Sequence, residues 1–245
     1  MTSFETKFLE QFALHLETRR DPDDGSGKKV RSFAEAFPGA TLDVLPDGHI
    51  KRSEIFALVA DESLTTATVS AAILAWGGMR LANRKTLLGS LHWLALADDI
   101  RRGGFDRKSA YKAFVTLQAR NEMKGMGPAF FTKLIYFLLP RNDPSKHAYI
   151  MDQWAGCSIN VLCGREVVLM DKSIRWKPDG VTCAVDFVVS PHNSPEHYDA
   201  FCEAMDALAA KFSLSPEQID RAVMGDGGKS PSEWRRLVIE NRRAA

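Results

Sequence analysis

The chain has 245 residues, which is enough for one large domain or two closely associated lobes with a substantial core. Hydrophobic residues make up 45% of it and charged residues 26%, a balance that excludes intrinsically disordered and fibrous proteins. The formal net charge of +1 neither favours nor excludes a nucleic-acid partner, because only a local basic face would matter. One basic cluster combines Arg235 and Arg236 with Arg242 and Arg243, although such clusters are more often solvated surface.

The cysteine pattern indicates neither a metal site nor a disulfide framework. The four cysteines have no CxxC spacing, and no histidine lies at a zinc-like distance from two of them. We therefore expect reduced, mostly buried thiols and no metal or other cofactor. The sequence shows no signal-peptide pattern and no apolar run of about 18 residues, so we expect a cytoplasmic protein that spans no membrane.

The first part of the chain reads as helical. Apolar residues recur at helical spacing between Phe4 and Thr18, and a flexible loop follows over residues 19–27. Residues 31–50 are rich in turn formers, so we expect no long element there. The pattern then predicts compact helices separated by short breakers, at residues 52–60, 65–76, 83–97, 106–119 and 128–139.

The second part is interrupted at residues 139–144, and a helix resumes near Asp152, which can cap it. Residues 166–190 fit a short β-hairpin or an irregular loop. Two late helices have strong start signals, Ser194-Pro195 for residues 195–212 and a capping box at Ser215 for residues 216–224. The fold class expected is all-α with at most a minor β-hairpin, as one domain in two lobes. Residues 52–139 form the helical lobe, and residues 1–51 and 140–245 form the other.

A glycine pair separates two of the predicted helices. In Gly125-Met126-Gly127 the glycines allow a sharp turn, and Met126 can fill the crease between the helices. Pro128 suits the first helical turn, and the N–H groups exposed there, including that of Ala129, are suited to a DNA phosphate. The alternative is an ordinary tight turn between two helices.

This segment resembles the helix-hairpin-helix of a DNA glycosylase superfamily in which a catalytic aspartate follows the hairpin. The aspartate of that superfamily comes roughly twenty or more residues later, and Asp152 lies 25 residues after Gly127. The resemblance covers residues 120–165, with weaker similarity on either side, and it is greatest to the branch with an 8-oxoguanine-glycosylase-like fold. It implies that the hairpin binds DNA and that Asp152 serves catalysis.

The proposed chemistry suits a carboxylate. Breaking an N-glycosidic bond builds positive charge on the deoxyribose, which a fixed aspartate such as Asp152 stabilises. The same group can orient or deprotonate an attacking water. The alternative is that Asp152 only caps a helix, and both roles can coexist.

The sequence departs from the bifunctional members of the superfamily. Those members carry a Schiff-base lysine two residues after the second glycine, where this chain has Ala129. Lys124 precedes the hairpin and is our candidate for an unusual nucleophile or a phosphate contact. Lys133 is expected on a different helix face from the usual lysine. We therefore expect a monofunctional enzyme that uses water and, with its cysteines dispersed, carries no iron–sulfur cluster.

A glycosylase of this kind must extrude the target nucleotide and fill the gap. In the segment 76–80, Met79 is our candidate wedge, and Arg80 is our candidate partner for the orphaned base. Gln153, Trp154 and Trp76 are expected to line the base pocket. For these residues, core packing or a solvated position is an alternative of comparable weight.

The expected partner is double-stranded DNA with a modified base, bound by a monomer. The small chain without the usual lysine favours a hypermodified phage base, such as glucosylated hydroxymethylcytosine, in antiviral defence. An 8-oxoguanine repair enzyme is the alternative within the same class. The rivals from other classes are a non-catalytic DNA-binding module and an all-α interaction protein.

Overall fold

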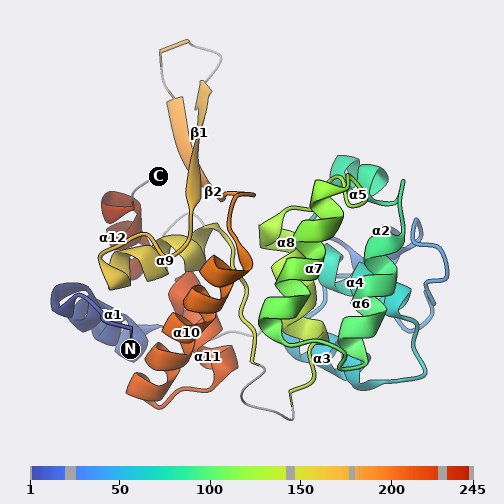
Figure 1. Cartoon of the computed structure of the whole chain (residues 1–245), viewed down its shortest axis with the longest axis horizontal. Helices are drawn as coiled ribbons and strands as arrows, with labels where there is room; N and C mark the ends of the chain where they lie inside the picture. Colours follow the sequence, from blue (N-terminus) through green and yellow to red (C-terminus); the bar gives the residue numbers. More distant parts are fainter. Residues whose placement is uncertain are drawn as a thin grey trace. The chain divides into compact units, whose positions relative to one another are not determined.

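The computed structural model describes residues 2–19, 26–141, 147–176, 180, 181, 183–225 and 231–242. Within these residues the chain forms twelve α-helices and one two-stranded antiparallel sheet (Figure 1). The expected all-α class with a minor hairpin is therefore confirmed. Contacts divide the chain into two compact units, Pro22–Tyr149 and the combination of Met1–Asp21 with Ile150–Ala245.

The unit Pro22–Tyr149 is built around one buried helix. Its helices are α2 (Val30–Ala34), α3 (Arg52–Ala60), α4 (Thr66–Trp76), α5 (Leu81–Leu87), α6 (His92–Arg101), α7 (Arg107–Ala119) and α8 (Pro128–Leu138). Every residue of α4 from Thr66 to Ala75 is buried, because α2, α3, α6 and α8 all pack against it. A helix that is buried on all sides needs such a surrounding shell.

The predicted helix over residues 83–97 is wrong, because the chain turns between α5 and α6. Gly89 and Ser90 close this turn by donating their backbone N–H groups to the carbonyls of Thr86 (3.2 Å) and Leu87 (3.3 Å). Glycine weakens a helix interior, and serine competes with helical hydrogen bonds. The other predicted helices of this unit begin and end within one residue of the observed bounds.

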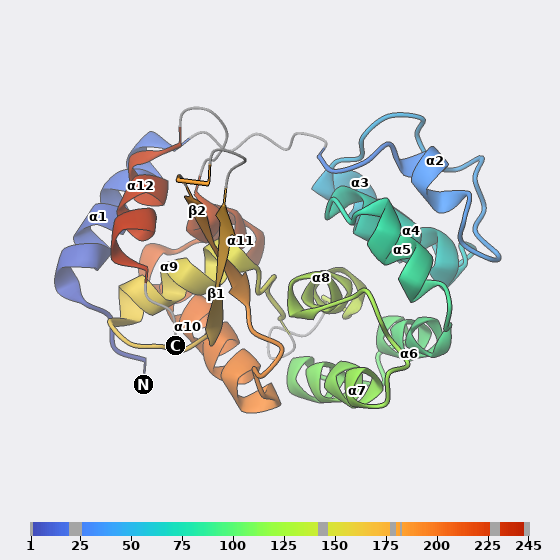
Figure 2. The same cartoon turned by 90° about the horizontal axis from the view of Figure 1, so that it is seen from above.

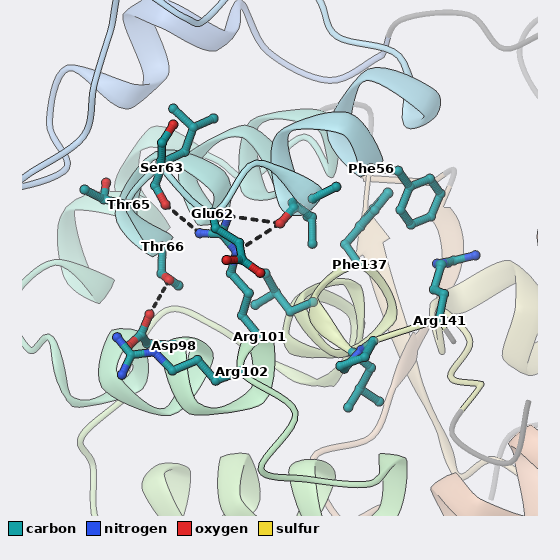
Figure 3. Close-up of a pocket in the computed structure, with 16 residues that line it drawn as sticks. Phe56, Glu62, Ser63, Thr65, Thr66, Asp98, Arg101, Arg102, Phe137 and Arg141 are labelled. Atoms are coloured by element: carbon teal, nitrogen blue, oxygen red, sulfur yellow. Dashed lines mark hydrogen bonds and ion pairs between the residues drawn. The ribbon is translucent and has the colours of Figure 1, made fainter. Parts of the chain in front are cut away.

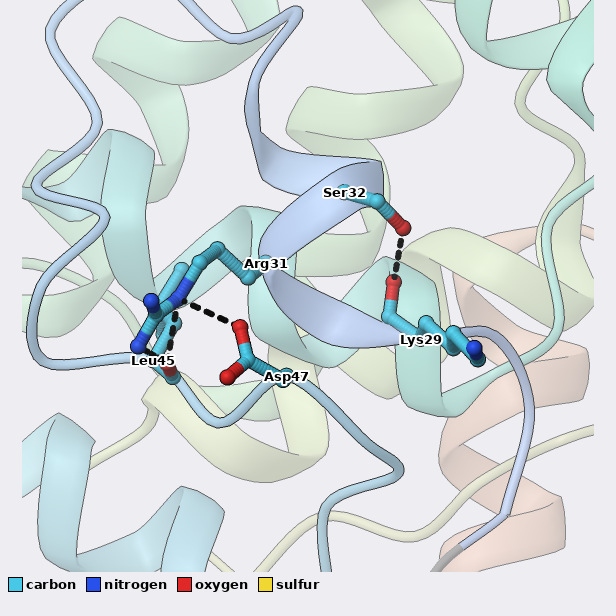
Figure 4. Close-up of polar contacts among 5 residues, drawn as sticks. All are labelled: Lys29, Arg31, Ser32, Leu45 and Asp47. Carbon is cyan, nitrogen blue, oxygen red and sulfur yellow. Dashed lines mark hydrogen bonds and ion pairs between the residues drawn. The ribbon is translucent and has the colours of Figure 1, made fainter.

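Residues 26–51 pack with the helical unit, which differs from the expected lobe boundary. Helix α2 buries Val30, Phe33 and Ala34 against α4. The guanidinium of Arg31 donates to the carbonyl of Leu45 from Nε (3.0 Å) and Nη2 (2.8 Å) and lies 3.1 Å from the Asp47 carboxylate (Figure 4). These tertiary contacts fix a turn-rich segment that has no periodicity of its own.

The second unit contains the remaining elements. They are α1 (Thr6–Thr18), α9 (Gln153–Cys163), β1 (Met170–Trp176), β2 (Cys183–Val189), α10 (Pro195–Phe212), α11 (Pro216–Met224) and α12 (Glu233–Asn241). Strands β1 and β2 pair from Met170↔Val189 to Trp176↔Cys183, so the segment is a hairpin rather than an irregular loop. The predicted bounds of α10 and α11 are confirmed, whereas α12, which lies beside α1 (Figure 2), was not predicted.

Aromatic packing joins α1 to α12, and a hydrogen bond joins α12 to α9. The rings of Phe12 and Trp234 meet edge to face at 4.9 Å, and Nε1 of Trp234 donates to Oγ of Ser158 at 3.2 Å. All four cysteines are free, and all but Cys183 are buried, as the sequence predicts. In the described part of the chain, no helix is long and apolar enough to cross a membrane.

Candidate active site and nucleic-acid interface

The predicted hairpin forms between α7 and α8, and its first glycine is sterically required. Gly125 has a φ of +89°, and a Cβ atom there would lie 2.5 Å from the carbonyl oxygen of Asn83. Such a contact is too short for any side chain, and the left-handed φ adds strain for all residues except glycine. Met126 is 2% exposed and fills the crease, as predicted, while its carbonyl accepts from Nε2 of Gln118 at 3.0 Å.

The second glycine has no comparable structural constraint. Gly127 is the N-cap of α8 with a φ of −96°, and an added Cβ would meet nothing within 4 Å. No side chain caps this helix, and Pro128 at its first position has no N–H to satisfy. The N–H groups of Phe130 (2.9 Å) and Phe131 (3.1 Å) donate to the Gly127 carbonyl, so in the first turn of α8 the half-buried Ala129 amide is the one that has no capping partner among the described residues.

A shallow hollow lies at this hairpin. It has a volume of about 410 Å³ and is lined by the segment from Met123 to Gly127 together with Asn83 and Gln118. Lys124 is exposed and belongs to the same lining. An uncapped helix start beside a lysine is suited to binding an anion such as a phosphate.

Lys133 lies on the same helix face as Ala129, so its expected placement on another face is wrong. The residues are four positions apart, one turn of helix. Nζ of Lys133 donates to the carbonyl of Ala129 at 2.6 Å, and the side chain is only 8% exposed. A Cβ atom on Gly77 would lie 2.8 Å from Cδ of this lysine, so the glycine makes room for it.

Asp152 begins helix α9, as predicted. Its Oδ1 atom accepts hydrogen bonds from the backbone N–H groups of Trp154 (2.9 Å) and Ala155 (3.1 Å). The other carboxylate oxygen, Oδ2, accepts no hydrogen bond from the residues that the structure describes. The side chain is half-buried. Capping therefore occupies one oxygen and leaves the second available to a ligand.

A buried aspartate, Asp220, fixes the backbone of the segment that precedes Asp152. Oδ1 of Asp220, on α11, accepts from the backbone N–H of Ile150 at 2.9 Å. Asp220, Ile150 and Met151 are all fully buried. Sequence reasoning missed Asp220, although a carboxylate among the buried positions of an amphipathic helix is a signal that it has a partner.

The residues after Asp152 pack against α12. Gln153 and Trp154 are half-buried, and the guanidinium carbon of Arg235 lies 3.6 Å from the centroid of the Trp154 ring. One face of the indole is thus covered by a cation, which the sequence did not reveal. The roles of Gln153 and Trp154 in a base pocket stay predictions.

The segment 76–80 does not present the predicted wedge. Met79 is fully buried, and its backbone N–H donates to the carbonyl of Leu74, so its side chain belongs to the core. Trp76 is half-buried, with its ring 5.2 Å from that of Phe137. Arg80 is exposed at the start of α5 and can still reach a ligand.

A cavity of the first unit lies away from the predicted site residues. It measures about 1000 Å³ and is lined at the C-terminal end of α8 by residues that include Phe137 (Figure 3). The hairpin precedes the other end of that helix. Arg101 in its wall donates to the carbonyls of Val59 and Leu64, and Asp98 accepts from the Thr66 hydroxyl at 2.6 Å. These polar groups hold the surrounding loop together, and no predicted site residue lines the cavity.

The two sets of predicted residues belong to different units. The hairpin and the segment 76–80 lie in Pro22–Tyr149, and residues 152–154 lie in the other unit. Two helical units, a glycine hairpin and a later capping aspartate are the features that the resemblance to a helix-hairpin-helix DNA glycosylase implies.

Comparison with known families supports this class. The model of a family described as "Putative 8-oxoguanine DNA glycosylase OGG-like protein" matches residues 26–224. The chain belongs to this OGG-like family, and the resemblance seen in the sequence is confirmed. No curated protein matched the chain, and neither did any solved structure. The matched region includes the hairpin and Asp152 and ends before α12.

Proposed function

We propose that this protein is a DNA glycosylase that holds duplex DNA through the hairpin Gly125–Gly127 and uses Asp152 to release a modified base. The observation that carries the proposal is the geometry of Asp152, which caps α9 through Oδ1 alone and keeps Oδ2 available. A residue that served only as a cap could be serine, threonine or asparagine equally well.

In the proposed reaction, the bond between C1′ of the deoxyribose and the base nitrogen breaks, and the base leaves with the electron pair. The carboxylate of Asp152 stabilises the positive charge that develops on the sugar. Water then adds at C1′, its proton passes to Asp152 or solvent, and the base is protonated. The product is an abasic site, and Asp152 returns to its carboxylate form.

The hairpin supplies affinity rather than chemistry in this proposal. The Ala129 amide at the start of α8 and the Lys124 side chain bind the phosphate backbone, which positions the duplex without reading its sequence. Arg80 is the remaining candidate to face the orphaned base. The protein acts as a monomer on double-stranded DNA.

Lys133 supports a second candidate, a bifunctional enzyme. Its amino group lies 2.6 Å from the carbonyl of Ala129, the position of the usual Schiff-base lysine. The deprotonated amine would attack C1′ and displace the base with its electron pair. The sugar ring then opens to an imine, and β-elimination breaks the C3′–O bond.

For the substrate, we propose a hypermodified base such as glucosylated hydroxymethylcytosine, in defence against phage. The support is Ala129 in place of the usual lysine, together with four cysteines that are too dispersed for an iron–sulfur cluster. The alternative, 8-oxoguanine, is supported by the description of the family. A base pocket large enough for a sugar stays a prediction.

The test incubates the protein with duplexes that carry one 8-oxoguanine, uracil, alkylated base or glucosylated hydroxymethylcytosine. Strand breaks are scored with and without hot alkali, for the wild type, Asp152→Asn and Asp106→Asn. Asp106 is the matched control, because it caps α7 through Ser109 N–H at 2.7 Å and has no proposed role in the chemistry.

We expect breaks only after alkali, on one substrate, in the wild type and Asp106→Asn but not in Asp152→Asn. Breaks without alkali, with borohydride trapping that Lys133→Gln abolishes and Lys124→Gln retains, would establish the bifunctional enzyme. DNA binding without cleavage of any substrate would support a binding module. If the protein showed neither DNA binding nor cleavage, the remaining interpretation would be an all-α interaction protein.

A further inference from the structure

Three arginines of the C-terminal basic cluster lie in α12 (Arg235 and Arg236) or directly after it (Arg242), and they have different surroundings. Arg236 is exposed, with 57% of its side-chain area accessible, and lies 3.8 Å from Glu233 one turn before it. This is the solvated position that the sequence favours for such clusters. Arg235 and Arg242 are half-buried instead, and both face helix α9.

Arg235 is held in a fixed orientation. Its Nη2 donates to the carbonyls of Met224 and Gly225, at the end of α11, the latter at 2.8 Å. The guanidinium carbon lies 3.6 Å from the Trp154 ring centroid. The guanidinium therefore donates to carbonyls at the end of a helix and lies over an aromatic ring, and both contacts are favourable for arginine.

Arg242 continues this arrangement on the side of the hairpin. Its Nη2 donates to the carbonyl of Val185 at 2.9 Å, and its guanidinium carbon lies 4.5 Å from the Phe187 ring and 5.9 Å from the Trp154 ring. Among the residues that the structure describes, Arg242 forms no ion pair with a carboxylate. Its positive charge is thus positioned but not neutralised.

Both charges act on the same part of α9 as Asp152. Burial raises the pKa of the Cys157 thiol to about 12; the charge of Arg242 opposes this rise, Asp152 reinforces it, and Arg235 also opposes it. Cys157 lies five residues after Asp152 in the chain. The two guanidinium groups and the carboxylate therefore share one electrostatic neighbourhood around the start of α9.

We propose that Arg235 and Arg242 form a phosphate-binding site beside Asp152 that holds the backbone phosphates flanking the extruded nucleotide. The inference rests on the proposed function, which brings a nucleotide with a phosphate on either side to Asp152. A guanidinium that lies against an aromatic face can still present its N–H edge, which suits phosphate oxygens. Arg242 donates only from Nη2 among the described residues, whereas Arg235, whose Nη2 donates to two carbonyls and whose Nε is buried, contributes chiefly its charge. This site lies in the second unit and is distinct from the hairpin, which binds phosphates in the first.

The first test measures the salt dependence of affinity. Binding of a fluorescent duplex is titrated by anisotropy over a range of salt concentrations in the Asp152→Asn background, so that no base is released. The logarithm of the binding constant K falls as the logarithm of the salt concentration rises. Each lost phosphate contact should make this negative slope shallower by about 0.9. We expect this decrease for Arg242→Gln, recovery of the slope in Arg242→Lys, and no change for the control Arg236→Gln.

The second test locates the phosphate. Duplexes carry a neutral methylphosphonate on one side of the target nucleotide or the other, or five positions away. A methylphosphonate at one of the flanking positions should weaken DNA binding by the protein with Arg242 and have little further effect on Arg242→Gln. A methylphosphonate at the distant position should weaken DNA binding by the two proteins equally. Arg235→Gln is included where thermal unfolding shows that it folds.

The proposal is overturned if Arg242→Gln keeps the parental slope, or if both flanking methylphosphonates weaken Arg242→Gln as much as its parent. This outcome is distinguishable from failure of the proposed function. A protein that cleaves its substrate through Asp152 with unchanged slopes keeps the function and loses this site. A protein that shows the slope change without cleavage keeps a phosphate site and loses the chemistry.

Discussion

Helices α8 and α9 both begin at a predicted site residue, yet their first turns present different charges to a ligand. Helix α8 has Gly127 as its N-cap and no side-chain cap, so the Ala129 N–H and the positive end of the helix dipole are not covered by a capping side chain. Helix α9 starts at Asp152, whose Oδ1 accepts from two of the first N–H groups. The first helix start is suited to an anion, and the second already contains one.

The difference explains how one kind of element serves two purposes. In the proposed function, the uncapped start of α8 would bind a backbone phosphate and so contribute affinity without selecting a base. A capped start fixes the position of a carboxylate, because two backbone hydrogen bonds hold one oxygen and direct the other. Binding and chemistry can then be altered independently, and the predictions below use this separation.

The largest expected effect is on catalysis at Asp152. Asp152→Asn and Asp152→Ala should both slow base release by about 10²–10³-fold, since the developing positive charge loses its counter-charge. Only the alanine variant should also lose the helix cap, at about 1 kcal/mol in the free energy of unfolding measured with urea. Equal base release by wild type and Asp152→Asn would contradict the account.

The two hairpin glycines should respond differently to alanine. Gly125→Ala should lower the free energy of unfolding by about 1–3 kcal/mol, because its φ is +89° and the new Cβ overlaps the Asn83 carbonyl. Gly127→Ala should change it by about 0.5 kcal/mol or less, since the space is open, but should weaken DNA binding several-fold by obstructing the phosphate. Denaturant unfolding and anisotropy titrations on both variants check this pair, and equal DNA affinity for Gly127→Ala and wild type would argue against the phosphate site.

The segment 76–80 offers a similar contrast. Met79→Ala should destabilise the fold by about 2–5 kcal/mol, because it removes a fully buried side chain. Arg80→Ala should leave stability within about 0.5 kcal/mol, since the side chain is exposed, and should reduce affinity for the lesion duplex. If Met79→Ala were as stable as the wild type but lost DNA binding, the predicted role of Met79 as a wedge would be supported instead.

The smallest effect concerns thiol labelling. Burial raises the pKa of Cys157 to about 12 and that of Cys163 to about 11, so neither forms appreciable thiolate at pH 8. A maleimide should label Cys183 rapidly in the native protein. Because only the alanine variant loses the cap of α9, mass spectrometry should find Cys157 modified faster in Asp152→Ala than in Asp152→Asn. Rapid labelling of Cys157 in the wild type would mean that the start of α9 opens readily.

Local signals explain why much of the fold was predictable. Ser194-Pro195 and the capping box at Ser215 fix the starts of α10 and α11 through contacts within three residues. Pro128 does the same for α8. The missed break between α5 and α6 also had a local signal in Gly89-Ser90, which the apolar spacing on both sides outweighed.

The candidate site was predictable only in part, because part of it depends on tertiary contacts. The glycine hairpin and the Asp152 cap are encoded within a few residues of sequence. The hydrogen bond from Ile150 to Asp220 and the stacking of Arg235 on Trp154 join segments 70 and 81 residues apart. No periodicity or spacing rule reveals such pairs, and the burial of Met79 was hidden for the same reason.

Single-turnover base release over a range of enzyme concentrations tests the separation of binding from chemistry most directly. It gives the maximal rate and the half-saturating concentration for the wild type, Asp152→Asn and Gly127→Ala on one substrate. We predict that Asp152→Asn lowers the maximal rate of base release and leaves the half-saturating enzyme concentration unchanged, which a binding titration of the same variant also measures. Gly127→Ala should raise the half-saturating concentration and keep the maximal rate. A maximal rate that Asp152→Asn retains, or that Gly127→Ala loses, would contradict the account.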